Sequence, residues 1–226
     1  MSSDSFEWDG RAVRPHHVSA STNDQDGTST LRVERDLTSL AFDAADLART
    51  VDEPTFVVID GLDIQDGAFE VQVRSRLLSP TPFEASQGFI GVAFRIAPDD
   101  SAFESIYLRP NAGRSPDQFI RNHTVQYFAY PDHKFDRLRE DGPGRYESWA
   151  DVGLDERITM RVEFKSSSAR LYLNDGHRPA FIVNQLLGST ESGTIGLWVD
   201  IGTEGFFRNL RILQQTRPAR TGGTGV

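Results

Sequence analysis

The sequence lacks cysteine entirely, contains only two lysines and has no long apolar run. Without cysteine, the chain has no disulfide, no thiolate metal ligand and no cysteine nucleophile. No segment approaches the roughly 20 apolar residues that a membrane-spanning helix needs, so no membrane partner is expected. The net charge of -9 argues against a general nucleic-acid-binding protein, so no nucleic-acid partner is expected either. The start, MSSDSFEWDG, lacks the basic and apolar parts of a secretory signal, which predicts a cytoplasmic protein unless the chain is processed from an exported one.

Arginine dominates the basic residues. Of the 24 lysines and arginines, only Lys134 and Lys165 are lysine. A base-composition bias of the source explains this excess simply. The functional interpretation is that arginine forks suit recognition of carboxylates, phosphates or sugar hydroxyls.

Short runs that alternate between apolar and polar residues fill most of the chain. Clusters of Gly, Pro, Asp and Asn separate them, which is typical of β-strands joined by turns. We expect strands at residues 55–60, 68–78, 88–97, 103–110 and 122–130, two more within 156–175, and others at 179–186, 193–200 and 205–214. The segment AADLARTV, residues 44–51, is the one expected helix.

Many strands with one apolar face each predict an all-β fold, a two-sheet antiparallel β-sandwich. A chain of 226 residues fits one such unit, so a single domain is expected over residues 1–215. The tail at residues 216–226, rich in Gly, Thr and Arg, predicts disorder.

The segment RNHTVQYFAYPDHKFDRLRE, residues 121–140, carries more polar and aromatic chemistry than core packing needs. Its alternation places His123 and Tyr127 on one side of the expected strand and Asn122, Gln126 and Tyr130 on the other. Gly91 and Ala93 supply small side chains that predict the floor of a concave, ligand-binding face. Which side of the 122–130 strand lines this groove stays open.

Three pieces, IDGLDIQDGAFEVQV, GFIGVAFRI and SGTIGLWVDIGTEGFFRNLRI, resemble the concanavalin A-like lectin/glucanase superfamily, the LamG-like jelly roll. RLYLND resembles its usual penultimate hairpin, and the resemblance covers residues 56–213. Within the superfamily the chain looks most like bacterial 3-keto-disaccharide hydrolase-type and uncharacterised LamG-like domains. The resemblance implies a jelly roll whose concave sheet binds carbohydrate, and the superfamily contains both lectins and enzymes.

The Glu-x-Asp-x-x-Glu strand of laminarinase-type glucanases has no counterpart here, since Gln72 follows Glu70 and Lys165 follows Glu163 at the spacing concerned. That argues against an ordinary retaining glycoside hydrolase. The residue types of the chain instead suit acid/base chemistry on a glycoside or a related anionic small molecule, by a lyase or a hydrolase. We therefore expect His123 as base and Tyr127 or Tyr146 as acid. The expected substrate-binding residues are Arg95, Tyr107, Arg109, Asn122, Gln126, Arg137, Arg139 and Trp198.

Two alternatives remain beside the enzyme. The same residues can hold a carbohydrate without turnover, as in a lectin, or serve a small-molecule biosynthetic enzyme that uses the same fold. Each residue also has a structural interpretation: a hydrogen-bonded strand histidine for His123, cross-strand packing for Tyr107 and Tyr127, and core packing for Trp198. The sequence does not indicate an oligomeric state.

No metal or other cofactor is the main expectation, with calcium at one acidic turn as the alternative. The acidic turn DGLDIQDG, residues 60–67, invites comparison with calcium sites, but its spacing differs from the EF-hand loop and turn formation explains Asp66-Gly67. His16 and His17 are adjacent, so on a strand they face opposite ways. Gly-rich phosphate loops, zinc-ligand spacings and a serine nucleophile elbow are also missing from the sequence.

Overall fold

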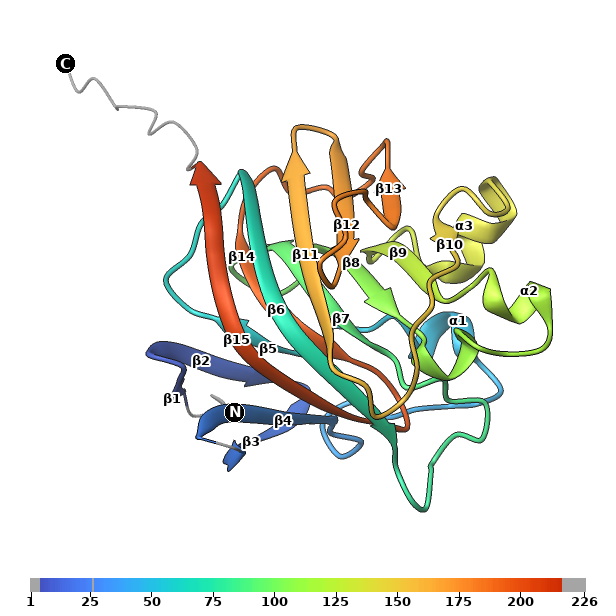
Figure 1. Cartoon of the computed structure of the whole chain (residues 1–226), viewed down its shortest axis with the longest axis horizontal. Helices are drawn as coiled ribbons and strands as arrows, with labels where there is room; N and C mark the ends of the chain where they lie inside the picture. Colours follow the sequence, from blue (N-terminus) through green and yellow to red (C-terminus); the bar gives the residue numbers. More distant parts are fainter. Residues whose placement is uncertain (1–4, 26, 217–226) are drawn as a thin grey trace.

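The computed structural model describes residues 5–25 and 27–216, and it consists of two antiparallel β-sheets packed face to face (Figure 1). The predicted two-sheet sandwich is confirmed. Eight strands form one sheet, in the spatial order β1 (Phe6–Trp8), β2 (Arg11–His16), β5 (Phe56–Ile59), β14 (Thr194–Val199), β7 (Ile90–Ile96), β8 (Phe103–Leu108), β9 (Val125–Tyr130) and β10 (Glu147–Ser148). Seven strands form the other, in the order β13 (Phe181–Val183), β12 (Ser168–Leu173), β11 (Ile158–Lys165), β6 (Asp66–Leu77), β15 (Thr203–Thr216), β4 (Thr28–Arg35) and β3 (Val18–Gln25).

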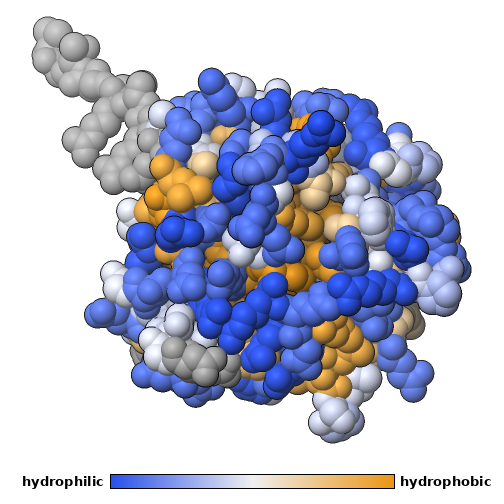
Figure 2. Space-filling model, in the orientation of Figure 1, coloured by the Kyte–Doolittle hydropathy of each residue, from blue (hydrophilic) through white to orange (hydrophobic). Residues whose placement is uncertain are grey.

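The seven-stranded sheet shows the alternation that its sequence predicts. Along β11, Ile158, Met160, Val162 and Phe164 are buried, and the residues between them are more exposed. The outward residues form ion pairs between neighbouring strands, such as Arg211 Nη2 to Glu70 Oε1 at 2.5 Å. Hydrophilic residues accordingly predominate on this face of the molecule, with hydrophobic ones visible between them (Figure 2).

The eight-stranded sheet is covered on both faces. Every residue of β7 and β8 is buried. Its inner face packs on the seven-stranded sheet, where the Phe94 and Phe164 rings stack with centroids 4.8 Å apart. Its other face, called the outer face below, carries Tyr107 and Trp198, with ring centroids 4.8 Å apart.

Chain segments next to the sheet cover this outer face, and the predicted open groove on it is wrong. The indole of Trp198 is fully buried and its Nε1 donates to Glu53 O at 2.8 Å. Above Gly91, a Cβ would lie 2.5 Å from Tyr107 Cβ, so the missing side chain makes room for a tyrosine and not for a ligand. Ala93, the other expected floor residue, is also fully buried.

Within the described residues, four short helices join the strands: α1 (Leu47–Thr50), the 3₁₀ helix η1 (Pro110–Ala112), α2 (Gln118–Arg121) and α3 (Phe135–Asp141). The helix expected at residues 44–51 exists as the shorter α1. None of the described helices is long and apolar enough to cross a membrane. At the other end of the chain, β15 continues to Thr216, the first residue of the predicted tail, and residues 217–226 lie outside the described residues.

The strand predicted at residues 122–130 starts too early. Asp117 caps α2, its side chain accepting from Phe119 N at 2.8 Å, and this favours a helical turn over an extended start. The backbone then turns through His123 before β9 begins at Val125. His123 and Tyr127 therefore do not share one face of a strand.

Candidate functional site

A pocket of about 540 Å³ opens at the β10 edge of the eight-stranded sheet, near α2 and α3 at the right of Figure 1. We call it the β10 pocket. Its lining residues come from the end of α2, from α3 and the turn that follows it, and from β10 and its exit: Phe119, Asn122, His123, Arg139, Pro143, Gly144, Glu147, Ser148 and Trp149.

One carboxylate, that of Glu147, organises the polar wall of this pocket. Its Oε2 lies 2.8 Å from His123 Nδ1, and its Oε1 accepts from Arg139 Nε at 2.7 Å. The Glu147 side chain is only 4% exposed and the His123 side chain 15%. The two oxygens therefore fix an imidazole and a guanidinium side by side at the pocket wall.

The imidazole of His123 is kept neutral around neutral pH. Burial lowers its pKa, the carboxylate of Glu147 opposes that shift, and the guanidiniums of Arg139 and Arg109 add to it. Its Nε2 is buried without a hydrogen-bond partner among the described residues, and its Nδ1 lies at ion-pair distance from Glu147 without the geometry of a hydrogen bond. A neutral imidazole with an unused ring nitrogen can accept or donate one hydrogen bond, depending on its tautomer.

Exposed aromatic rings flank the polar wall. Trp149 is 45% exposed, and its Nε1 donates to Gly113 O at 3.1 Å, which holds the indole in place. Phe119 is 71% exposed, and its ring packs edge-on against the His123 ring, with the two ring centroids 4.5 Å apart. Exposure of two large rings beside one pocket departs from the usual burial of such residues and makes this surface the candidate for a binding site.

A row of polar side chains supports the pocket from within the sheet. Glu147 lies opposite Gln126 across the β9–β10 pair, and Gln126 lies opposite Tyr107 across the β8–β9 pair, so the three share the outer face. Arg109 Nη2 donates to Gln126 Oε1 at 2.6 Å and to Tyr107 Oη at 2.8 Å. Burial raises the pKa of Tyr107, so its hydroxyl stays protonated. These residues fix the back of the site, and both Gln126 and Tyr107 are buried.

The predicted site residues divide into two groups. Those at or directly behind the β10 pocket are Asn122, His123, Arg139, Arg109, Gln126 and Tyr107. Those that the structure places elsewhere are Arg95, Tyr127, Tyr146, Arg137 and Trp198. Strand alternation in the sequence could not separate the two groups, because both contain residues of the same strands. Gln126 and Tyr127, for example, are neighbours on β9 and fall into different groups.

Three members of the second group have their polar atoms bonded within the fold. Tyr127 Oη donates to Glu104 Oε2 at 2.5 Å and accepts from Leu187 N at 2.7 Å. Arg95 reaches the same Glu104 and lies over the Phe164 ring between the sheets. Tyr146 Oη donates to Gln185 O at 3.2 Å. Neither tyrosine hydroxyl is placed to exchange a proton at His123.

The other two do not line the pocket. Arg137 is exposed on α3, where its Nη1 donates to Asp132 O at 3.2 Å. Trp198, expected as a substrate-binding residue, lies fully buried on the outer face. The exposed tryptophan of the site is Trp149 instead.

Glu147 and Phe119 are the residues that sequence reasoning missed. Glu147 lies in a stretch of two strand residues, too short for an alternation pattern to be read. Phe119 precedes the expected strand in a segment with no apolar period. Only the pairing of β10 with β9 brings Glu147 beside His123 and Arg139.

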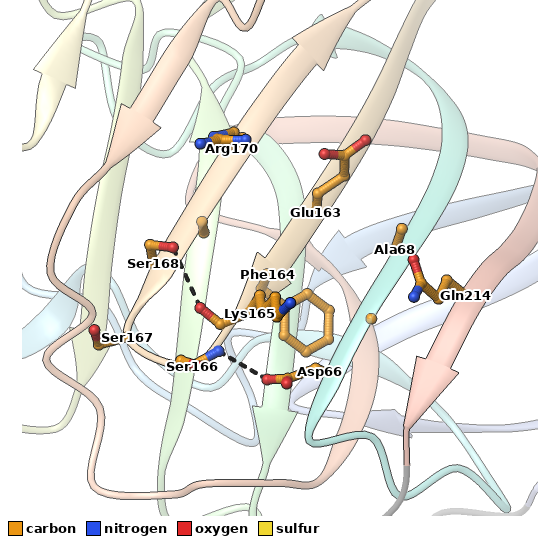
Figure 3. A pocket seen from close by; sticks show the side chains of 12 residues that line it. Asp66, Ala68, Glu163, Phe164, Lys165, Ser166, Ser167, Ser168, Arg170 and Gln214 are labelled. Carbon is orange, nitrogen blue, oxygen red and sulfur yellow. Dashed lines mark hydrogen bonds between the residues drawn. The ribbon is translucent and has the colours of Figure 1, made fainter.

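A second pocket, of about 390 Å³, lies on the outward side of the seven-stranded sheet (Figure 3). Its lining residues include Gly67 and Ala68 on β6, and Glu163, Arg170 and Gln214 on neighbouring strands. Glu163 forms an ion pair with Arg161, so these side chains belong to the ion-paired, solvated face of the sheet. With no exposed aromatic ring among its lining residues, this pocket is a poorer candidate than the β10 pocket.

The described residues contain no group of three or more His, Asp or Glu side chains that could bind a metal ion together. In the acidic turn at residues 60–67, Asp66 Oδ1 accepts from Ser166 N at 2.8 Å. That carboxylate oxygen therefore links β6 to the turn between β11 and β12.

Comparison with known proteins places the fold. No protein-family model and no curated protein matches the chain. Among solved structures, the carbohydrate-binding module CBM66 from Bacillus subtilis matches with a TM-score of 0.51 and 11% identity, over 87% of this chain and 94% of that one. The chain has a jelly-roll fold. A β-glucanase from Bacillus licheniformis matches with a TM-score of 0.41 and 10% identity, over 91% of this chain and 79% of that one. At these identities the jelly-roll likeness concerns architecture alone.

Proposed function

We propose that this jelly-roll protein binds carbohydrate in the β10 pocket. The observation that carries the proposal is the pairing of two exposed rings, Trp149 and Phe119, with a fixed polar wall of His123, Glu147 and Arg139. Aromatic rings stack on the C–H faces of sugars, and fixed polar groups select their hydroxyls. The architectural likeness to a carbohydrate-binding module agrees with this proposal.

Binding without hydrolysis fits the pocket better than glycoside cleavage. Common glycosidase mechanisms need two carboxyl groups that flank the scissile bond. Among the lining residues of the β10 pocket, Glu147 is the single carboxylate, and both of its oxygens are engaged by Arg139 and His123. It acts here as a positioning group for its two neighbours.

The experiment is calorimetric titration of the full chain with a panel of neutral and acidic oligosaccharides. Trp149→Ala is expected to weaken binding at least about 10-fold, since it removes the stacking surface. Ile182→Ala is the matched control, because Ile182 is a similarly exposed apolar residue on β13, outside the β10 pocket. Equal affinities of Trp149→Ala and the unmodified protein, or no binding to any glycan, would overturn the proposal.

A second candidate is an acid/base enzyme at the same pocket. The observation that favours it is the contact of Glu147 with Nδ1 of His123, which leaves Nε2 as the ring nitrogen for proton transfer. Incubation with the same glycans, followed by absorbance of unsaturated products and by reducing ends, tests it. Turnover that His123→Gln abolishes would support the enzyme, and binding without turnover would exclude it.

A further inference from the structure

We infer that the β10 pocket selects acidic sugars, namely oligosaccharides that carry carboxylates on their rings. The inference rests on the proposed function, since it specifies the ligand class of the same pocket. It depends on the balance of charge around His123 and Trp149.

Among the charged groups that act on His123, cationic groups outnumber anionic ones. The charged groups that act on His123 are one carboxylate, Glu147, and two guanidiniums, those of Arg139 and Arg109. The chain as a whole has a formal net charge of -9. A local excess of positive charge in so acidic a protein attracts anions to this pocket in preference to the rest of its surface.

Arg139 already neutralises Glu147, so the remaining positive charge belongs to other residues. Arg109 gives its hydrogen bonds to two neutral groups, Gln126 Oε1 and Tyr107 Oη. No ion pair joins its guanidinium to a carboxylate within residues 5–25 and 27–216. Arg109 is therefore a buried guanidinium behind the pocket wall that makes no ion pair of its own, and the carboxyls of Asp52 and Glu147 act on it from longer range.

Arg121 is not itself a lining residue, but it brings a second guanidinium against Trp149, on the aromatic side of the pocket. Its guanidinium carbon lies 5.0 Å from the centroid of the Trp149 ring. Its Nε is buried without a hydrogen-bond partner, and the described part of the chain offers it no ion-pair partner. A sugar stacked beside Trp149 would place a ring carboxylate within reach of a guanidinium that lacks an anion, the pairing that arginine makes best.

Neutral sugars gain nothing from this arrangement. Hydroxyl groups can bond to His123 or Asn122, but they leave the charges of Arg121 and Arg109 unbalanced. A carboxylate balances them in a partly buried place, where charge–charge attraction is screened less than at an open surface. The predicted preference is thus a difference between two ligands with the same sugar ring, of which one carries a negative charge and the other is neutral.

The test uses oligouronides and their fully methyl-esterified forms, which keep the sugar ring and remove its charge. In low-salt buffer, calorimetry on the full chain is expected to show at least about 10-fold tighter binding of the acid than of the ester. Sodium chloride is expected to weaken binding of the acid and to leave the ester almost unchanged. Arg121→Gln is expected to weaken the acid about 5- to 20-fold with little effect on the ester, and Arg121→Lys to recover only part of that loss, because lysine keeps the charge without the planar fork.

Arg49→Gln is the matched control, because Arg49 is a highly exposed arginine on α1, outside the lining of the β10 pocket. Equal binding of acid and ester, with Trp149→Ala still disruptive, would overturn the acidic preference and leave the proposed function standing. An acid preference that Arg121→Gln and Arg49→Gln reduce equally would overturn the assignment to this pocket. Failure of acid and ester alike to bind, together with all neutral glycans, would overturn the proposed function as well.

Discussion

Glu147 Oε2 lies 2.8 Å from His123 Nδ1, although the two residues belong to segments separated by β9 and α3. The β9–β10 pairing sets this contact, since it places Glu147 opposite Gln126 at the sheet edge. Arg139, from α3, occupies the second oxygen. The polar wall of the pocket therefore depends on one buried carboxylate.

Replacement of Glu147 by Gln should lower the pKa of His123 further. The carboxylate is the charged neighbour that raises that pKa, against burial, Arg139 and Arg109. Arg139 also loses its anionic partner, so the free energy of unfolding should fall by about 1–3 kcal/mol. NMR titration of the imidazole and urea denaturation measure the two effects. Asp141→Asn is the control, because it removes an exposed partner of Arg137. It should change the free energy of unfolding by less than about 1 kcal/mol. An unchanged pKa of His123 in Glu147→Gln would contradict the expectation.

Tyr127→Phe should destabilise the protein and leave carbohydrate binding unchanged. Its hydroxyl bonds Glu104, which is fully buried, and accepts from Leu187 N. Loss of the hydroxyl leaves both groups short of a partner and should cost about 1–3 kcal/mol in chemical denaturation. Tyr172→Phe is the control, because the Tyr172 hydroxyl makes no hydrogen bond within the described residues. A glycan affinity that falls with Tyr127→Phe would restore Tyr127 to the site.

Gly91→Ala should strongly destabilise the fold, because its Cβ would lie 2.4 Å from the carbonyl oxygen of Ile106 and 2.5 Å from Tyr107. Backbone atoms of a central strand cannot move aside cheaply, so a loss above about 2 kcal/mol is expected. Gly142→Ala is the control, since a Cβ there meets only Arg145 at an ordinary 3.4 Å. Thermal unfolding compares the two variants. Similar melting temperatures for both would show that the outer face is looser than the structure indicates.

Asp52→Asn should flatten the dependence of stability on pH. Burial, with help from Asp200, raises the pKa of Asp52 to about 7, whereas an unfolded aspartate titrates near 4. Between these values the folded state holds the proton more tightly, so stability falls as the pH rises from about 4 to about 7. Asn keeps an oxygen for Phe135 N and cannot ionise.

Relative to the unmodified protein, Asp52→Asn should therefore gain about 2–3 kcal/mol between pH 5 and pH 8. Urea denaturation at the two pH values measures the gain. Asp132→Asn changes an exposed aspartate and should follow the unmodified protein at both. A gain of equal size in Asp132→Asn would show that general charge, and not burial of Asp52, causes the effect.

Much of the fold could be predicted because strand alternation is a local signal. The pattern of β11 identifies its buried face without any knowledge of its neighbours, since successive side chains point to opposite faces. The site is different. His123 could be chosen from its residue type, but its strand position was wrong because the side chain of Asp117 caps a short helix just before it. Glu147 could not be chosen, because its role depends on a strand partner from β9.

The sequence by itself determined the two-sheet sandwich, since the alternation of apolar residues fixes which side of each strand must be buried. It also determined that no disulfide or thiolate stabilises the fold. Only the tertiary structure decided what covers the outer face of the eight-stranded sheet, where Glu53 and its neighbours lie over Trp198. It likewise decided which of the polar residues meet in one pocket. Long-range packing settles both points, because covering a face and completing a pocket depend on residues far apart in the chain, which a local pattern does not record.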